Sequence, residues 1–174
     1  MQDIADETEL SKAALHYHFD GKHDLLVSFL DHLYERFETR IDDPDGETPA
    51  ERLTALVQCL VTKQTDAPAF QTALLEIKAQ SPYDEAFRER LQRFDATFAA
   101  RVRDHVARGV ADGTFRADLD PDEVASVLTT FVTGAQTRHV AVGHSPEASA
   151  AAIETYIDEA LRPGDDPASD GRSE

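Results

Sequence analysis

The sequence contains very little cysteine and no tryptophan. Cys59 is the only cysteine among 174 residues, so the chain cannot form an internal disulfide. No apolar run approaches the ~20 residues that span a bilayer, and no basic segment followed by an apolar one opens the chain as a signal peptide would. These absences predict a cytoplasmic protein that neither crosses a membrane nor depends on disulfides.

Basic residues are also scarce. The chain has 17 Lys and Arg residues against 34 Asp and Glu, a net charge of −17, and only 4 of the 17 are lysines. Such an acidic balance excludes a simple nucleic-acid coat protein. It is typical of proteins from extreme halophiles, because the Debye length is about 3 Å at molar salt and screens the self-repulsion of the surface. An ordinary acidic cytosolic protein is the alternative.

Signatures of catalysis are missing too. The sequence contains no GxSxG, no P-loop and no HExxH. His16, His18 and His23 are close in sequence, but positions two apart on a helix point in different directions and cannot easily chelate one ion. We therefore expect no metal and no cofactor, and a helical enzyme is the weakest of the functions considered.

Helix-start and helix-stop signals are present instead. An N-capping side chain precedes proline at 48–49, 81–82, 120–121 and 145–146. Gly113, Gly143 and Pro163 provide the matching stops. Because strand signals are nearly absent, the predicted fold class is all-α. The predicted helices cover residues 3–8, 12–18, 22–40, 49–64, 68–79, 82–112, 121–142 and 146–161.

The first 26 residues contain a motif that could bind DNA. In IADETELSKAALHYHFDGKHDLL, the spacing of Ile4, Leu10, Leu15 and Phe19 suits two short helices that cross at a tight turn. Ser11 is a good N-cap for the second helix. This is the pattern of a helix-turn-helix, in which the second helix enters the major groove of DNA.

The same stretch resembles the DNA-binding head of the tetracycline-repressor (TetR) family. The match to the family pattern covers Ile4, Ala5, Leu10, Ser11, Leu15, His18, Phe19, Lys22 and Leu25. The later stretch FQTALLEIKAQSPYDEAFRERL is similar to the C-terminal domain of choline–betaine-type repressors. Carried over by position, the resemblance implies DNA contacts from Ser11, Lys12, Ala14, His16, Tyr17, His18 and Lys22.

The head departs from the family pattern at three positions and at its start. Glu9 stands where the family has a turn glycine, His16 replaces the usual tyrosine, and Ala14 replaces a common threonine. The family also has a leading helix in front of the two short ones. We therefore expect that Met1 is an internal methionine and that about twenty further residues precede it. Without that helix, DNA binding would be weak.

The resemblance divides the chain into three parts. Residues 1–23 are the incomplete helix-turn-helix head, residues 24–162 a helical-bundle domain for ligand binding and dimerisation, and residues 163–174 a polar, disordered tail. Apolar stripes and the family analogy give two candidate sites. The predicted ligand pocket comprises Phe70, Gln71, Leu74, Ile77, Phe87, Leu91, Phe94, Phe131, Gln136 and His139. The predicted homodimer interface comprises Val124, Leu128, Phe131, Val132, Ala135, Ile153, Tyr156, Ile157, Ala160 and Leu161.

The sequence thus predicts a ligand-responsive, homodimeric, DNA-binding transcriptional regulator that acts as a repressor. Its partners would be a double-stranded DNA operator, an unknown small-molecule effector and a second copy of the chain. The alternative is a ligand sensor or dimerisation partner of the same fold that does not bind DNA.

Overall fold

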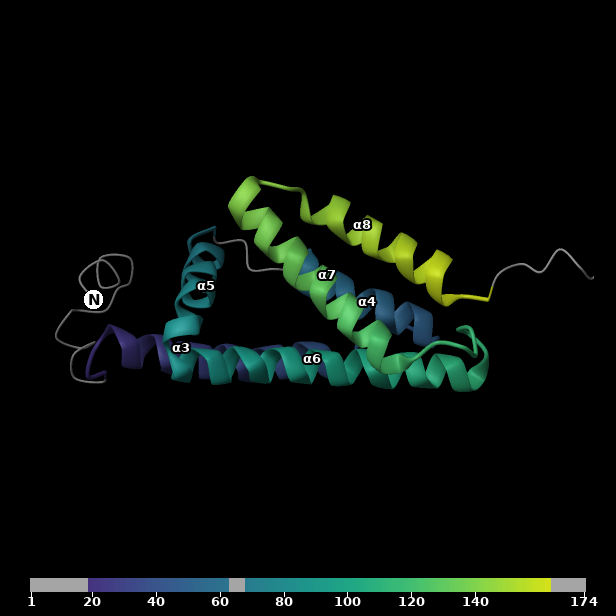
Figure 1. Cartoon of the computed structure of the whole chain (residues 1–174), viewed down its shortest axis with the longest axis horizontal. Helices are drawn as coiled ribbons and strands as arrows, with labels where there is room; N and C mark the ends of the chain where they lie inside the picture. The colour runs from purple at the N-terminus through teal and green to yellow at the C-terminus, as the bar shows by residue number, and fades with distance from the viewer. Residues whose placement is uncertain (1–18, 63–67, 164–174) are drawn as a thin grey trace, which may run out of the picture.

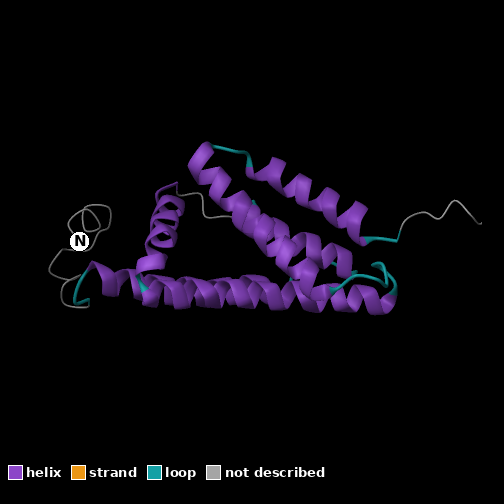
Figure 2. Ribbon diagram, viewed as in Figure 1, coloured by secondary structure: helices purple, strands orange, loops and turns teal. Residues whose placement is uncertain are grey.

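The computed structural model describes residues 19–62 and 68–163, and within them every regular element is helical (Figures 1 and 2). The prediction of an all-α fold is confirmed. The two short helices predicted at 3–8 and 12–18 lie outside the described residues. The elements are α3 (Lys22–Asp42), α4 (Pro49–Val61), α5 (Pro68–Gln80), the 3-10 turn η1 (Ser81–Tyr83), α6 (Glu85–Asp112), α7 (Pro121–Val142), α8 (Pro146–Tyr156) and the π turn η2 (Ile157–Leu161).

Three of the four predicted helix starts are confirmed by their capping hydrogen bonds. The Thr48 hydroxyl accepts from the backbone N–H of Glu51 at 3.2 Å, and the Glu51 carboxylate accepts from the N–H of Thr48 at 3.1 Å, which is a capping box. The Asp120 carboxylate accepts from the N–H of Asp122 at 2.8 Å, and Ser145 caps α8 in the same way. Sequence therefore fixes where α4, α7 and α8 begin.

The fourth predicted start, at Ser81, is wrong. The Ser81 hydroxyl donates to the Lys78 carbonyl at 2.9 Å, and Ser81 lies in η1, directly after α5. Helix α6 begins after Asp84, whose carboxylate accepts from the N–H of Phe87 at 3.1 Å. The stretch SPYD contains two good capping residues within four positions, and the later one caps the long helix.

The two predicted glycine stops are confirmed. Gly113 ends α6 with φ of 83°, and Gly143 ends α7 with φ of 66°. Both angles lie in the left-handed region, which only glycine enters without a steric penalty. The chain can therefore reverse sharply after each of these helices, which folds α7 back onto α6 and α8 back onto α7.

Helices α3 and α6 lie side by side and run parallel (Figure 1). Their polar contacts join residues that are separated by 61, 59, 63 and 59 positions, so the two helices keep one register along their shared length. The paired residues are His23 and Asp84, Asp31 and Arg90, Tyr34 and Thr97, and Asp42 and Arg101. The start of α3, which overlaps the end of the predicted head, thus lies beside the start of α6.

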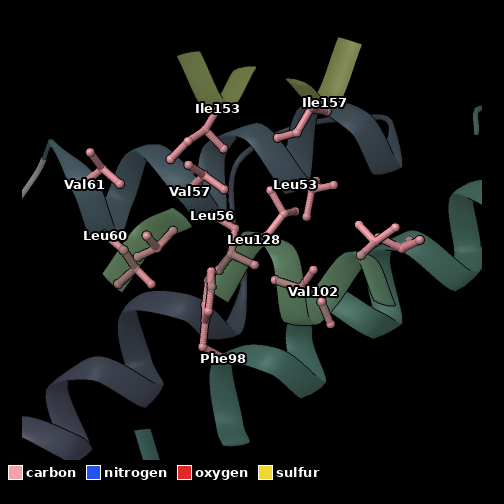
Figure 3. Packing of buried hydrophobic residues seen from close by; sticks show 14 of the residues in the cluster. Leu53, Leu56, Val57, Leu60, Val61, Phe98, Val102, Leu128, Ile153 and Ile157 are labelled. Carbon is pink, nitrogen blue, oxygen red and sulfur yellow. The ribbon is translucent and has the colours of Figure 1, made fainter. Parts of the chain in front are cut away.

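Buried apolar side chains form two groups of different size. The larger group, here called the main core, joins α4, the second half of α6, α7 and α8, and Leu53, Leu56, Val102 and Leu128 lie at its centre (Figure 3). The smaller group, the end cluster, has only Leu30, Ile77 and Phe87 fully buried, with partly buried leucines of α3, α5 and α6 around them. The predicted site lies where these two groups meet.

Candidate functional site

A cavity of about 330 Å³ lies between α3, α5, α6 and α7. Leu60, Phe98 and Val132 of the main core line it on one side. Leu33, Leu74 and Leu91, which pack against the end cluster, line the other. Its volume is at the lower end of the range for small-molecule sites, and its wall is mostly apolar with a few polar groups, as such sites usually are. The remaining lining residues are Arg36, Phe37, Arg40, Phe70, Lys78, Ser81, Phe94, Asp95, Thr129, Thr133 and Gln136.

Helix α3 contributes one continuous face to the cavity. Leu33, Arg36, Phe37 and Arg40 are spaced by three, one and three residues, so they follow one side of the helix over two turns. Since the predicted head ends at residue 23, in the first turn of α3, a molecule in the cavity would touch the helix that leads to the head.

Aromatic rings make up much of the apolar wall. The rings of Phe37 and Phe94 lie 5.0 Å apart in a tilted arrangement, and Phe94 also meets Tyr34 edge-on at 5.2 Å. At the other side, Phe70 meets Phe29 edge-on at 5.6 Å. These distances are in the range that aromatic pairs favour, so the rings hold one another in place around the cavity.

Two polar side chains from different helices meet in the cavity wall. The Lys78 ammonium of α5 donates to the Gln136 side-chain oxygen of α7 at 3.2 Å. The Gln136 side-chain nitrogen in turn donates to the Leu60 carbonyl at 3.2 Å, which fixes which end of the amide faces Lys78. Burial lowers the pKa of the Lys78 ammonium. Thr129 also lines the cavity, and its buried hydroxyl has no hydrogen-bond partner among the described residues.

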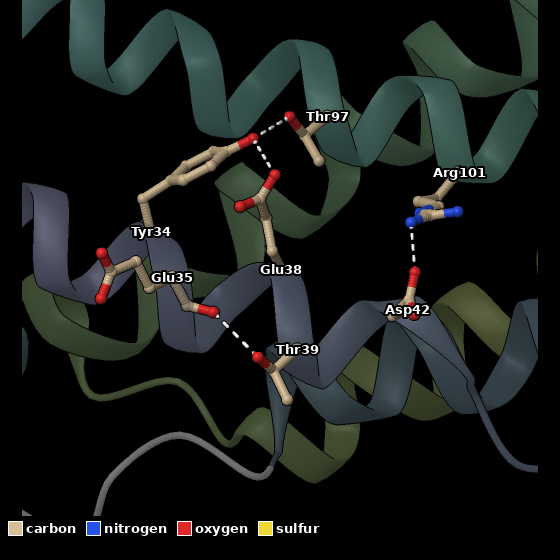
Figure 4. A network of polar contacts seen from close by, with 7 residues as sticks. All are labelled: Tyr34, Glu35, Glu38, Thr39, Asp42, Thr97 and Arg101. Atoms are coloured by element: carbon tan, nitrogen blue, oxygen red, sulfur yellow. Dashed lines mark hydrogen bonds and ion pairs between the residues drawn. The ribbon is translucent and has the colours of Figure 1, made fainter.

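Polar contacts attach α3 to α6 beside the cavity (Figure 4). The Tyr34 hydroxyl contacts Glu38 and Thr97, each at 2.7 Å, and Arg101 pairs with Asp42. These groups are part-buried or exposed, so each contact contributes modestly to the stability of the fold. The attachment of α3 to α6 beside the cavity therefore depends partly on polar contacts of modest strength.

A further polar contact joins the first turn of α3 to the N-cap of α6. His23 Nε2 lies 2.8 Å from the Asp84 carboxylate, and the His23 ring stacks on Phe87 with 5.1 Å between centroids. Desolvation of Asp84 opposes ionisation of the carboxyl, but the Phe87 N–H and His23 outweigh it and lower its pKa. Asp84 thus serves both as the cap of α6 and as the anchor of the start of α3.

Half of the predicted pocket residues line the cavity. They are Phe70, Leu74, Leu91, Phe94 and Gln136. Ile77 and Phe87 instead are buried in the end cluster, and Phe131 is 41% exposed on the outside of α7. His139 lies at the end of α7, where its Nδ1 is 3.1 Å from the His144 carbonyl oxygen. Gln71 lies on α5 and does not line the cavity.

Most of the predicted interface residues belong to the core of their own chain. The apolar stripes that these residues form lie on the inner faces of α7, α8 and η2. Helices α4 and α6 of the same chain pack against those faces. Phe131, Tyr156 and Ala160 keep some exposure, and the rings of Phe131 and Tyr156 meet edge-on at 5.4 Å. The buried residues are Val124, Leu128, Val132, Ala135, Ile153, Ile157 and Leu161.

Of the predicted DNA contacts, the structure describes only Lys22, which is exposed at the first position of α3. The others, Ser11, Lys12, Ala14, His16, Tyr17 and His18, lie outside the described residues. In the described part of the chain no helix is both long and apolar enough to cross a membrane. Nor do three His, Cys, Asp or Glu side chains gather there as a metal site would require.

Sequence reasoning missed the charged residues of the cavity. Arg36 and Arg40 follow Leu33 and Phe37 on one face of α3, and this mixture of basic and apolar residues was the available signal. Lys78 is one of only four lysines and is the only basic residue of α5, which could also have singled it out. Nothing in the sequence indicated that these three side chains share a cavity.

Comparison with known proteins gives matches in both halves of the chain. The family model "BetI-type transcriptional repressor, C-terminal" matches residues 49–162, and "Bacterial regulatory proteins, tetR family" matches residues 1–29. Among curated proteins, the HTH-type transcriptional repressor KstR2 of Mycolicibacterium smegmatis is 30% identical over 145 residues. That alignment covers 76% of this chain and 66% of the repressor.

Solved structures give the same match. A TetR transcription regulator from Haloarcula marismortui is 36% identical with a TM-score of 0.80, and the alignment covers 87% of this chain and 86% of the other. A transcriptional regulator from Saccharomonospora viridis, solved in complex with choline, is 22% identical with a TM-score of 0.76, covering 92% and 85% of the two chains. The second likeness concerns the fold alone.

Proposed function

Because the chain belongs to the TetR family of bacterial regulatory proteins, with a C-terminal domain of the BetI-type repressors, we propose that it is a ligand-responsive, DNA-binding transcriptional repressor. In this proposal residues 1–23 bind an operator, and residues 24–162 bind an effector and dimerise. The observation that carries the proposal is the cavity, because α3 forms one of its walls.

The proposed mechanism couples the cavity to the head through α3. A ligand that contacts Leu33, Phe37 and the two arginines of that face would push or pull on the helix. Helix α3 has 21 residues and is therefore about 30 Å long, so a small tilt at the cavity displaces its far end. In a dimer, two recognition helices must lie about 34 Å apart to enter successive major grooves. A modest tilt of α3 is then enough to move one recognition helix out of its major groove.

The homodimer is proposed to form through the outer sides of α7 and α8. Phe131 is exposed there beside Tyr156, and Ala148, Ala151 and Ala152 present small exposed side chains that would allow close helix packing. Stable interfaces of this kind bury on the order of 2,000 Å². Light scattering should give a dimer for the wild type and a monomer for Phe131→Asp. A monomeric wild type at micromolar concentration would refute the dimer.

We also propose that the protein is cytoplasmic and adapted to high salt. The net charge of −17 supports the adaptation to high salt. Repulsion between surface carboxylates should destabilise the fold in dilute buffer. The thermal midpoint should therefore rise between dilute buffer and molar KCl, and a flat or falling midpoint would contradict the adaptation.

The DNA contacts proposed from the family pattern remain Ser11, Lys12, Ala14, His16, Tyr17, His18 and Lys22. A gel shift with the DNA immediately upstream of the protein's own coding sequence tests the function. We expect a specific complex that competitor DNA of unrelated sequence does not remove, and Lys22→Ala should weaken it through loss of a phosphate contact. If no specific complex forms across a range of salt concentrations, the chain is instead a ligand sensor that does not bind DNA.

A further inference from the structure

The balance of charge at the cavity is the reverse of that in the whole chain. Across the sequence, acids outnumber bases by 34 to 17. The cavity wall contains three basic side chains, Arg36, Arg40 and Lys78, and a single acid, Asp95. Arg36, Arg40 and Asp95 are exposed at its rim, whereas Lys78 is half-buried. None of these four side chains takes part in an ion pair within the described residues. A basic cavity in an acidic protein indicates that the cavity is built for an anion.

Lys78 provides the clearest point of recognition. Its ammonium carries three N–H donors, and the structure assigns one of them to Gln136. Burial has already removed part of its hydration. A neutral apolar ligand would complete that desolvation without replacing the lost water, and a cationic ligand would add repulsion. An anionic oxygen would pair with the ammonium instead, and the unpartnered hydroxyl of Thr129 could donate to the same ligand.

The rest of the wall sets the shape of the ligand. Phe37, Phe94 and Phe98 together with Leu33, Leu74 and Leu91 enclose the space beside Lys78. At about 30 Å³ for each water-sized atom, a volume of about 330 Å³ holds on the order of ten non-hydrogen atoms. The ligand is therefore small, with an apolar body against these side chains and a polar group that meets Lys78.

We propose that the effector is an amphipathic anion, with an apolar body of about ten non-hydrogen atoms and one anionic oxygen group bound by Lys78. This inference rests on the proposed function, since it describes the effector of the same cavity. Gln136 positions the ammonium, because its own amide is held by the Leu60 carbonyl. Arg36 and Arg40 lie on α3 and would attract the same charge, so anion binding acts on the helix that leads to the head.

The test is a calorimetric titration of the full chain with three probes that share one alkyl chain. Decanoate is the anion, 1-decanol the neutral analogue and decyltrimethylammonium the cation. The two ions are kept below their micelle concentrations and the alcohol below its solubility limit. We expect the wild type to bind decanoate at least about tenfold more tightly than either analogue, as a charge-assisted hydrogen bond in a buried site should achieve. Decanoate affinity should also fall at alkaline pH as the ammonium of Lys78 loses its proton, although the carboxylate stays ionised.

Two variants locate the effect, and a third serves as control. Lys78→Met should reduce decanoate affinity about tenfold and leave decanol binding unchanged. Gln136→Glu, which places a carboxylate beside the ammonium, should reduce decanoate affinity even if Lys78→Met does not fold. Arg88→Met removes an exposed basic residue of α6 outside the cavity and should bind all three probes as the wild type does.

Equal affinity for decanoate and decanol, a preference for the cation, or no saturable binding of any probe would each overturn the inference. So would decanoate binding that neither Lys78→Met nor Gln136→Glu affects. The titration contains no DNA, so its failure is distinct from failure of the proposed function, which the gel shift decides.

Discussion

The main core and the end cluster use the same kinds of side chain but differ in how completely they are closed. The main core joins α4, α6, α7 and α8 with the end of α3, and its central residues, such as Leu53 and Leu128, are entirely buried. The end cluster buries only Leu30, Ile77 and Phe87, and beyond them the apolar side chains face the cavity or solvent. One half of the domain is thus a rigid frame, and the other has room to move.

The contacts of α3 follow the same division. Its last buried residue, Ile41, belongs to the main core, whereas Leu30 belongs to the end cluster. Between them α3 faces the cavity on one side, and on the other it buries Tyr34 against α6 and makes part-buried polar contacts. Regions with few buried contacts open at lower free energy than the core around them. A helix whose middle turns line a cavity, and whose start is held by the smaller of the two clusters, is suited to transmit a change in the cavity.

The largest expected effect compares one leucine from each region. Leu56 and Leu30 are both 0% exposed, so the two alanine variants remove the same group from equally buried positions. Leu56→Ala should lower the free energy of unfolding by about 3–5 kcal/mol, and Leu30→Ala by about 2–3 kcal/mol, because neighbours next to a cavity can relax into the space. Denaturant unfolding measures both. Equal losses, or a larger loss at Leu30, would contradict the division into frame and movable half.

A smaller effect is expected from the polar contacts between α3 and α6. Tyr34→Phe removes the hydroxyl that contacts Glu38 and Thr97 but keeps the ring, over which Arg93 lies at 3.6 Å. The free energy of unfolding should fall by about 1 kcal/mol. Thr39→Val is the matched control, because the Thr39 hydroxyl donates only to the exposed carbonyl of Glu35 within α3. A Tyr34→Phe variant no less stable than this control would show that the contact does not hold the helices together.

The smallest expected effect is a pH dependence of the free energy of unfolding that comes from the buried His105. Desolvation, together with the neighbouring arginines Arg108 and Arg52, lowers the pKa of His105 below its ordinary value of 6.5. The unfolded chain therefore binds a proton at His105 before the folded chain does. This contribution to stability is fully present above about pH 6.5 and is lost as the pH falls through the lowered value. Thermal unfolding should show a shallower pH dependence between pH 7 and 5 for His105→Gln. An unchanged slope would exclude this role.

Local chemistry explains why the sequence predicted the frame better than the site. Capping at Thr48, Asp120 and Ser145 and reversal at Gly113 and Gly143 depend on a few adjacent residues, and all five behaved as predicted. The spacing of apolar residues by three or four positions also identified a buried side of α7 and of α8. Periodicity does not say what covers a stripe, however, so residues such as Leu128 and Ile157 were predicted to face a second copy and instead are buried within the chain.

The cavity was only half predictable for a related reason. Phe94 and Phe87 have the same side chain on the same helix, yet Phe94 lines the cavity and Phe87 fills the end cluster. The difference depends on where α3 and α5 cross α6, which is a property of the tertiary structure. Lys78 was missed because its role requires Gln136 of a helix 58 residues further on.

The most direct test of the central claim is the DNA affinity of a variant whose cavity is filled from within. Leu74→Trp adds an indole to the cavity wall without any need to know the effector, and Gln92→Trp on the exposed side of α6 is the control. Fluorescence anisotropy with the protein's own upstream DNA should show at least about tenfold weaker binding for Leu74→Trp and wild-type binding for the control. A folded Leu74→Trp variant that binds DNA as tightly as the wild type would contradict the coupling between cavity and head.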